Sequence, residues 1–514
     1  MDHENEYDRV GEKSGPFRHQ SHQRPRTRRE FLGQGFLTGA AMIAGPSLWG
    51  LLRSEEARAM APNCGIGGAL ANRIPLIVID LGGGASTAGS NVIVGTQDQT
   101  TGLLSEAGYM KQGLPLAMTP IADPNVMVGM PVVPPDPNDL GIIWHSGSAM
   151  LDGIRTRASD ATLGNTNGAV FCARSDNDTG NNPHNPMYGL HHAGLDGDLV
   201  TLIGTEPSDS GGRSMAPAGM IDPAVRPTKV DRPSDATGLV DTGKLIQLLN
   251  EDDAAAVMFA VQEISDRKVG AITEDMLVEE LIQCGFRQTT DLVTRFGNPS
   301  AFDPSADPVI QTIFPGGIGQ SEFRKTASVM KLVVNRFAGA GTIQFGGYDY
   351  HDSTRATGEA KDRVAGECIG AILEYAANRL DDQGQPDPTP VAIYVLSDGS
   401  VFSDGVLDNS QGGAGKGIWR GDNSSTASTF MLVYDPDGRP TMTSVGTQVG
   451  RFKANGSVDT DATIIADEVP LLTEAVVLNY VALHDDVASF DGYLNHGLGT
   501  NLAPLIAFDP LPRF

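Results

Sequence analysis

The stretch LIVIDLGGGAST, at residues 76–87, joins a run of apolar and β-branched side chains to three consecutive glycines. A short run of this kind, with no alternating polar face, predicts a strand that is buried on both faces of a sheet. Asp80 lies near the carboxyl end of this strand, where the glycines that follow let backbone approach a ligand closely. Two interpretations stay open: a metal or anion site that uses the Asp80 carboxylate, and a glycine turn that only reverses the chain.

Five further segments have the same composition and predict strands of the same sheet: residues 169–173, 199–204, 342–345, 391–396 and 430–434. The helical spacing of apolar residues predicts three helices, at residues 274–296, 355–380 and 470–483. Together these elements indicate an α/β fold, in which a mostly parallel sheet has helices on both faces. Segments rich in Gly, Pro, Asn and Asp predict long loop insertions at residues 95–138, 174–192 and 205–241.

The composition limits which partners the protein can have. The chain has 514 residues, with 63 Asp and Glu against 37 Lys and Arg, and its formal net charge is -26. Nucleic acid is therefore not expected as a partner, because a phosphate backbone is bound by concentrated positive charge. The cysteines at positions 64, 172, 284 and 368 are far apart and form no CxxC pair, which argues against a thiolate zinc cluster. Disulfides and buried free thiols both stay open for them.

The first residues carry the features of an export signal. Residues 27–32, TRREFL, resemble the twin-arginine signal, and residues 57–59, ARA, resemble a signal-peptidase site. We therefore predict that residues 1–59 are a cleaved signal region, that residues 60–514 form a single large domain, and that the protein is periplasmic or extracellular. The twin-arginine translocase and signal peptidase would be its partners in transit. The apolar stretch at residues 36–52 is shorter than the roughly 20 residues that cross a bilayer, so no permanent membrane anchor is expected. The alternative is an arginine-rich surface segment.

Two later strand ends also carry side chains that can bind a cation. Residues 345–352, FGGYDYHD, follow one predicted strand, and the carboxylate of Asp349 and the imidazole of His351 can reach one divalent ion. Residues 391–400, VAIYVLSDGS, place Asp398 at the end of another strand. Because the ends of parallel strands share one edge of a sheet, we predict a site for Ca²⁺, Mg²⁺, Mn²⁺ or Zn²⁺ formed by Asp80, Asp349, His351 and Asp398. The alternative is that Asp349 caps the following helix and His351 faces solvent.

The order of these features resembles the bacterial domain of unknown function 1501 family, which is related to the sulfatases and alkaline phosphatases. The resemblance covers most of residues 70–435 and is specific at the first strand, with its glycines, and at the FGGYDYH motif. It implies an alkaline-phosphatase-like sheet with a metal-lined edge, in which Asp349 and His351 are ligands. His184 agrees with a histidine of the family, and Asp80 and Asp398 match aspartates of the sulfatases.

Because the sequence departs from the family pattern, two hypotheses for its function stay open. Gly399 stands where a metal-binding histidine would follow Asp398, and Asp422-Asn423 stands near an expected Asp-His pair. The missing histidines favour a degenerate, non-catalytic binding or surface-assembly protein, with an envelope or extracellular protein as its partner. The alternative is a metal-dependent hydrolase of a phosphate or sulfate ester.

Such a hydrolase needs a hydroxyl or modified-thiol nucleophile beside its metal. Ser86 and Thr87 are the catalytic candidates nearest to the predicted site along the chain. The Cys-x-Pro-x-Arg pattern of sulfatases is missing from the sequence, which excludes a formylglycine nucleophile. The alternative role for both residues is a helix N-cap.

Overall fold

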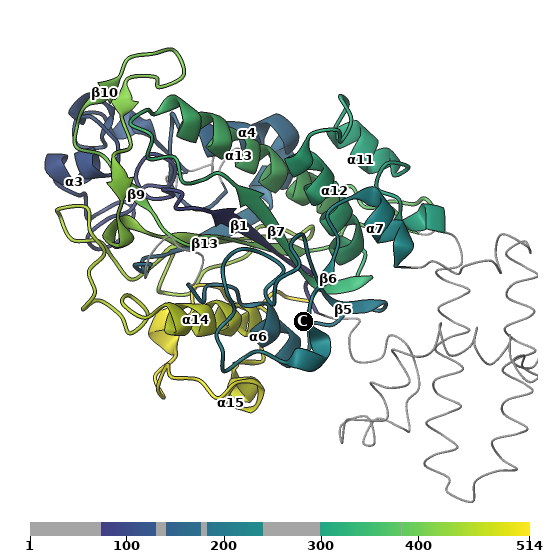
Figure 1. The fold of residues 1–514 in the computed structure, drawn as a ribbon. Coiled ribbons are helices and arrows are strands. Elements are labelled where there is room, and N and C mark those ends of the chain that lie inside the picture. The colour runs from purple at the N-terminus through teal and green to yellow at the C-terminus, as the bar shows by residue number, and fades with distance from the viewer. Residues whose placement is uncertain (1–72, 130–139, 176–181, 240–298, 382, 514) are drawn as a thin grey trace, which may run out of the picture. The chain divides into compact units, whose positions relative to one another are not determined.

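The fold is seen in a computed structural model of the chain, which describes residues 73–129, 140–175, 182–239, 299–381 and 383–513 (Figure 1). These residues belong to one compact unit, which comprises Gly67–Asp241 and Pro299–Phe514. The predicted signal region and the predicted helix at residues 274–296 lie outside the described residues, as do Cys64 and Cys284. The single domain at residues 60–514 therefore stays a prediction.

An eight-stranded sheet forms the centre of this unit. Its strands are β1 (Leu76–Gly82), β4 (Thr166–Phe171), β5 (Val200–Gly204), β6 (Thr228–Lys229), β7 (Ala338–Gly346), β8 (Val391–Ser397), β13 (Thr429–Tyr434) and β14 (Gln448–Val449). Their order is β14-β4-β13-β8-β1-β7-β5-β6. Only β13 runs against the other strands of this sheet. The predicted mostly parallel α/β sheet is thus confirmed, and all six predicted strands are present.

Helices cover both faces of the sheet. The α-helices of the described residues are α3 (Glu106–Lys111), α4 (Ala149–Arg157), α5 (Asp160–Gly164), α6 (Met187–His192), α7 (Pro233–Gly238), α11 (Pro308–Ile313), α12 (Ser321–Val334), α13 (Ala356–Ala377), α14 (Val469–Ala482) and α15 (Phe490–Tyr493). Figure 1 shows α4, α12 and α13 over one face and α6 and α14 over the other. The predicted helices at residues 355–380 and 470–483 are α13 and α14, with nearly the predicted bounds.

Short two-residue strands order the loops beyond the sheet: β2 (Met127–Val128), β3 (Trp144–His145), β9 (Val401–Phe402), β10 (Leu407–Asp408), β11 (Lys416–Gly417) and β12 (Gly421–Asp422). β9 pairs with β12, and β10 pairs with β11. The chain after β8 therefore runs out from the sheet and doubles back on itself before it returns as β13. This excursion brings residue 422 back toward the end of β8.

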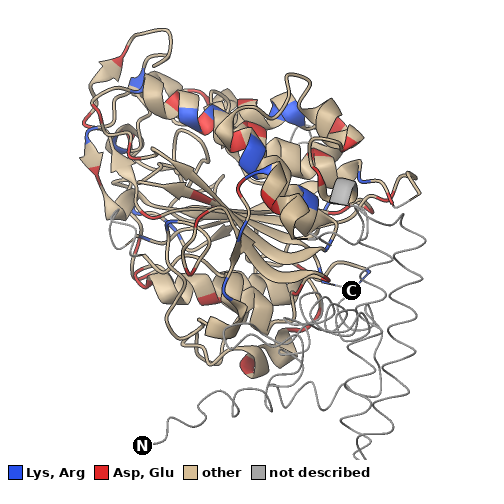
Figure 2. Cartoon of the chain, turned by 45° about the vertical axis from the view of Figure 1, so that its right-hand side comes forward, with Lys and Arg blue, Asp and Glu red and all other residues tan. Residues whose placement is uncertain are grey.

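The core is mostly apolar, and most charged residues lie on the helices and loops. Every residue of β1 is buried, which explains why its sequence has no polar alternation. Figure 2 shows the strands of the large sheet almost free of charged residues, while both signs of charge line the helices. Cys172 and Cys368 are free and buried. None of the helices in the described residues combines the length and apolarity needed to span a bilayer.

Helices α4 and α13 pack at backbone distance. A Cβ atom at Gly366, on α13, would lie only 1.9 Å from the carbonyl oxygen of Met150, on α4. A Cβ atom at Gly153, on α4, would likewise lie 2.1 Å from the carbonyl oxygen of Arg363. Glycine at these positions lets the two helices touch, and the amino end of α4 is thereby held against the first half of α13.

Candidate cation site at the carboxyl edge of the sheet

The strands that carry the predicted ligands are neighbours. β8, β1 and β7 lie side by side and run in parallel, so their carboxyl ends meet at one edge of the sheet, as the sequence predicts. Asp80 is the fifth residue of β1, Asp398 directly follows β8, and Asp349 follows β7 by three residues. What each carboxylate does there depends on the loops that close over the edge.

A glycine turn after β1 lies between the two other strand ends. Gly83 and Gly84 have φ angles of 132° and 124°, which L-residues with a side chain rarely adopt. A Cβ atom at Gly83 would lie 2.3 Å from the backbone nitrogen of Asp349. On its other side, the Gly83 N–H donates to Oδ1 of Asp398 at 2.6 Å. The turn therefore contacts both the loop after β7 and the loop after β8.

Three side chains at this edge could hold one cation. Ligand atoms of Asp349, His351 and Asp422 all lie within 4.8 Å of one another, and no other such group of three or more occurs in the part of the chain that the structure describes. Nε2 of His351 lies 2.5 Å from Oδ1 of Asp349 and 3.2 Å from Oδ1 of Asp422. All three side chains reach solvent, with exposed fractions of 52% for Asp349, 36% for His351 and 48% for Asp422. Two carboxylates and one imidazole would leave coordination positions open for water or a ligand.

Asp422 was not among the predicted ligands. It lies in β12, which pairs with β9 so that Asp422 is opposite Val401, four residues beyond the end of β8. The one signal in the sequence was that Asp422-Asn423 stands near an expected Asp-His pair. The hairpin-like return of the chain, which no local pattern indicated, brings it to the site.

Asp80 and Asp398 do not join this group. Asp80 accepts hydrogen bonds from the backbone N–H groups of Arg213 and Ser214, at 2.7 and 2.8 Å, and from the Ser214 hydroxyl at 3.1 Å. Oδ2 of Asp398 accepts from Nε of Arg213 at 2.9 Å. Of the four predicted ligands, Asp349 and His351 thus belong to the group, whereas Asp80 and Asp398 are bonded to other parts of the protein. Arg213 comes from a loop insertion and supplies a positive charge at the place where the sequence predicts a metal.

Burial sets the protonation of these two carboxyl groups. Asp80 is fully buried, and burial, together with the nearby charge of Asp398, raises the pKa of Asp80 to about 6 against the hydrogen bonds that lower it. Burial also raises the pKa of Asp398, although the Gly83 N–H and the Arg213 guanidinium favour its charged form. The pair is held by an arginine and by backbone N–H groups, an arrangement that leaves little need for a cation.

The predicted catalytic hydroxyls are buried. Thr87 Oγ1 donates to the carbonyl oxygen of Ser428 at 2.6 Å, and Ser86 Oγ has no hydrogen-bond partner among the described residues. No helix begins at either residue, so the helix-cap alternative is wrong. The cap alternative for Asp349 is wrong as well, because the residue at the N-cap of α13 is Arg355. The nucleophile role of Ser86 and Thr87 stays a prediction that their burial does not favour.

His184 is also buried, and it lies outside the group of Asp349, His351 and Asp422. Neither ring nitrogen has a hydrogen-bond partner among the described residues, and burial lowers the pKa of His184 to about 4. The imidazole is therefore neutral at physiological pH. Its agreement with the family histidine does not bring it into the candidate site.

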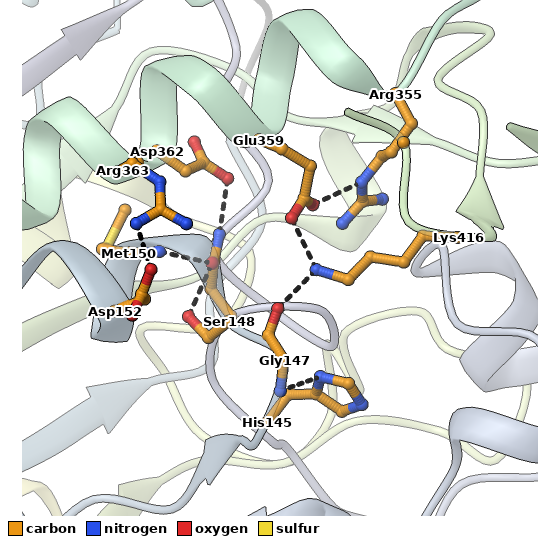
Figure 3. A network of polar contacts seen from close by, with 12 residues as sticks. His145, Gly147, Ser148, Met150, Asp152, Arg355, Glu359, Asp362, Arg363 and Lys416 are labelled. Carbon is orange, nitrogen blue, oxygen red and sulfur yellow. Dashed lines mark hydrogen bonds and ion pairs between the residues drawn. The ribbon is translucent and has the colours of Figure 1, made fainter. Parts of the chain in front are cut away.

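A buried polar network lies along the first half of α13 (Figure 3). Glu359 accepts from Nε of Arg355 at 2.7 Å and from Nζ of Lys416 at 2.6 Å, and Lys416 also donates to the carbonyl oxygen of Gly147 at 2.6 Å. The guanidinium of Arg355 lies 4.2 Å from the ring centre of Trp419. These charges are paired inside the protein, where water does not screen them.

Asp362 is the second carboxyl group of this network. Its Oδ2 accepts from Nδ2 of Asn91 at 2.7 Å and its Oδ1 from the hydroxyl of Tyr350 at 3.2 Å. Burial raises the pKa of Asp362 to about 7, and the negative charge of Glu359 acts in the same direction. Asp362 therefore holds a proton in the folded protein at pH values where an exposed aspartate has lost it.

This shift makes the stability of the protein depend on pH. Between the unfolded pKa near 4 and the folded pKa of about 7, the folded state binds one proton more than the unfolded state, so stability falls as pH rises. We expect the stability of wild type relative to Asp362→Asn to decrease by roughly 1.4 kcal/mol per pH unit in this window. Urea unfolding at pH 5, 6 and 7 measures this slope.

Asp307 supplies the control for this measurement. It is a buried carboxyl group bonded to Tyr375, near the other end of α13. Burial would raise its pKa, but the charge of Lys331 and the hydrogen bonds outweigh burial and lower it. Stability should therefore still fall as pH rises from 5 to 7 in Asp307→Asn. If stability depends on pH equally in wild type and in Asp362→Asn, the raised pKa of Asp362 is wrong.

The carboxyl edge of the sheet thus carries an exposed group with three ligand atoms beside a buried pair of aspartates that an arginine holds. The likeness to the domain of unknown function 1501 family rests on the residues quoted above and stays a prediction. The chain matches no protein-family model, no curated protein and no solved structure.

Proposed function

We propose that this protein is an exported binding protein on an alkaline-phosphatase-like scaffold, and that it contacts an envelope or extracellular partner through a divalent cation. The cation site consists of Asp349, His351 and Asp422. The observation that carries the proposal is that three ligand atoms of these exposed side chains lie within 4.8 Å of one another. A cation held by three protein ligands keeps positions open that a carboxylate or carbonyl group of a partner can fill.

The composition of the site favours one class of cation. An imidazole nitrogen with two carboxylate oxygens suits Zn²⁺ or Mn²⁺ better than Ca²⁺, which prefers an all-oxygen shell of six to eight ligands. The acidic surface of the chain supports cation binding in general, because a net charge of -26 raises the local concentration of cations.

The arrangement of the other aspartates argues against the hydrolase alternative. Ester hydrolysis on two metals needs a second set of ligands beside the first. Asp80 and Asp398 would be that set, and they are bonded to Arg213 instead. The hydroxyls of Ser86 and Thr87 are buried, which leaves neither in position to attack a substrate at the exposed site.

Calorimetric titration of the exported protein with Zn²⁺ and Mn²⁺ tests the proposal. We expect one site per chain, and we expect affinity to fall at least about 10-fold in His351→Ala and in Asp422→Asn, since even the loss of an outer-shell partner costs this much. A screen with phosphate and sulfate monoesters should show no turnover in the wild type.

The chain offers a matched control for this titration. His496 lies 2.7 Å from Asp491, and this histidine and aspartate belong to no group of three ligands among the described residues. His496→Ala should therefore leave the affinity unchanged. Wild type that binds neither cation would refute the proposal, and ester turnover that disappears in His351→Ala would favour the hydrolase alternative.

A further inference from the structure

The segment that carries two of the candidate ligands has a buried side and an exposed side. Asp349 and His351 reach solvent, whereas Tyr348 and Tyr350, which alternate with them, are each only 1% exposed. Burial thus alternates along the segment, and the two tyrosines anchor it from within while the ligands face out. How firmly the tyrosines are held therefore sets how firmly the ligands are held.

The hydroxyl of Tyr350 belongs to a closed ring of hydrogen bonds. It accepts from the backbone N–H of Ser86 at 2.9 Å and donates to Oδ1 of Asp362 at 3.2 Å. Oδ2 of Asp362 accepts from Nδ2 of Asn91 at 2.7 Å, and the same amide nitrogen donates to the carbonyl oxygen of Ser86 at 3.2 Å. The ring thus ties the ligand segment to α13 and to the end of the glycine turn.

Neighbouring groups contact two members of this set of hydrogen bonds, Asn91 and Tyr350. The hydroxyl of Ser148 donates to Oδ1 of Asn91 at 2.8 Å, which turns the amide nitrogen of Asn91 toward Asp362. Ser148 is itself the N-cap of α4 and accepts from the Leu151 N–H. The indole of Trp419 stacks on the phenol of Tyr350, with the two centroids 6.3 Å apart.

The ring has no solvent-exposed member. Ser86, Asn91, Tyr350 and Asp362 are all buried, so water does not compete for their hydrogen bonds. The charged groups that face Asp362 are Glu359, Arg355 and Lys416, which are themselves paired (Figure 3). Because these bonds are buried, removal of one member leaves a polar group of another member without its partner.

We propose that Tyr350 and Asp362 are positioning residues, which hold Asp349 and His351 in the geometry that binds the cation. This inference rests on the proposed cation site and deepens it, because it names what keeps two exposed ligands in place. Without the Tyr350 hydroxyl, the buried N–H of Ser86 loses its acceptor, and the segment is no longer tied to α13 at this point.

The test uses Co²⁺ as a spectroscopic probe of the site in the full protein. The visible absorption of bound Co²⁺ reports the coordination geometry, which a change in overall stability does not alter. We expect Tyr350→Phe and Asp362→Asn to change this spectrum and to weaken Co²⁺ binding about 10-fold, the lower end of the effect of lost outer-shell partners. The double variant should bind no more weakly than either single one, because the residues act through one ring.

Tyr375→Phe is the matched control. The hydroxyl of Tyr375 donates to a buried carboxylate, Oδ2 of Asp307, at 2.9 Å, near the other end of α13. This variant removes the same kind of bond and should leave the Co²⁺ spectrum and affinity as in the wild type. An unchanged spectrum in Tyr350→Phe, or an equal change in Tyr375→Phe, would overturn the inference.

A second measurement separates this inference from the proposed function. Amide hydrogen exchange of residues 345–352, without any cation, should be faster in Tyr350→Phe than in wild type and unaffected in Tyr375→Phe. Wild type that binds no Co²⁺ would refute the cation site alone, and the exchange result would still decide whether the ring holds the segment. Equal exchange in wild type and in both Tyr350→Phe and Asp362→Asn would refute the positioning role.

Discussion

Alanine in place of Gly83 is expected to abolish cation binding at Asp349, His351 and Asp422 and to lower the free energy of unfolding by about 3 kcal/mol. The new Cβ atom would lie 2.3 Å from the backbone nitrogen and 2.8 Å from the Cβ atom of Asp349. Backbone cannot yield as a flexible side chain does, so the segment that carries the ligands has to move. Calorimetric titration with Zn²⁺ and urea unfolding measure the two effects.

Gly84→Ala separates the clash from the backbone strain. Gly84 has a φ angle of 124°, close to the 132° of Gly83, but the nearest heavy atom to its Cβ would be the Ser400 nitrogen at 3.5 Å. Gly84→Ala should therefore show the strain, of order 1–3 kcal/mol, and keep the cation affinity. If Gly83→Ala binds Zn²⁺ as the wild type does, contact with the glycine turn does not position the site.

The sheet could be predicted because buried strands have a local signature. The runs at residues 76–82 and 391–397 are apolar except for Asp80 and Ser397 near their carboxyl ends, and both become strands with every residue buried. Glycine and aspartate close them, which marks where the chain leaves the sheet. Composition within six or seven residues was therefore enough to place the strand ends, and parallel pairing brought the ends together.

The division of the predicted ligands could not be foreseen from the sequence, because it depends on contacts between distant segments. Arg213 meets Asp398 from a position 185 residues earlier in the chain, out of a loop with no periodic pattern. Asp422 reaches His351 only because β12 pairs with β9. Local patterns show that a carboxylate lies at a strand end, but not which partner a loop delivers to it.

The start of α13 shows how a local pattern can mislead. An aspartate shortly before a helix suggests a cap, yet Asp352 accepts from the N–H and hydroxyl of Thr354, before the helix begins. The residue at the N-cap, Arg355, instead has a buried side chain that stacks on Trp419. The carboxylate of Asp408, from a distant loop, accepts from the backbone N–H groups of Arg355 and Ala356 at 2.9 and 3.3 Å, so a tertiary contact and not the preceding aspartate caps α13.

Arg213→Ala is expected to make the stability of the protein depend on a cation bound by Asp80 and Asp398. The guanidinium of Arg213 is bonded to Asp398, which is near enough to Asp80 for its charge to raise the pKa of Asp80. Without this guanidinium, two buried carboxylates would face each other with no positive charge to separate them. We expect the free energy of unfolding to fall by about 2 kcal/mol. This is less than the roughly 3–5 kcal/mol lost when one partner of a fully buried ion pair is removed, because the Arg213 side chain is 44% exposed.

A divalent cation should restore this loss, since it supplies the missing charge and binds only the folded state. The measurement is thermal unfolding with and without Mn²⁺ in a His351→Ala background, which removes the exposed site, so that any stabilisation by Mn²⁺ comes from Asp80 and Asp398. Arg226→Ala is the control, because its ion pair with Asp209 is exposed and worth less than about 1 kcal/mol. If Mn²⁺ stabilises Arg213→Ala no more than Arg226→Ala, the guanidinium does not occupy the place of a metal. If Mn²⁺ stabilises Arg213→Ala alone, Arg213 is the group that keeps a cation away from Asp80 and Asp398. This edge of the sheet would then bind a second cation, in addition to the one at Asp349, His351 and Asp422, once that single arginine is removed.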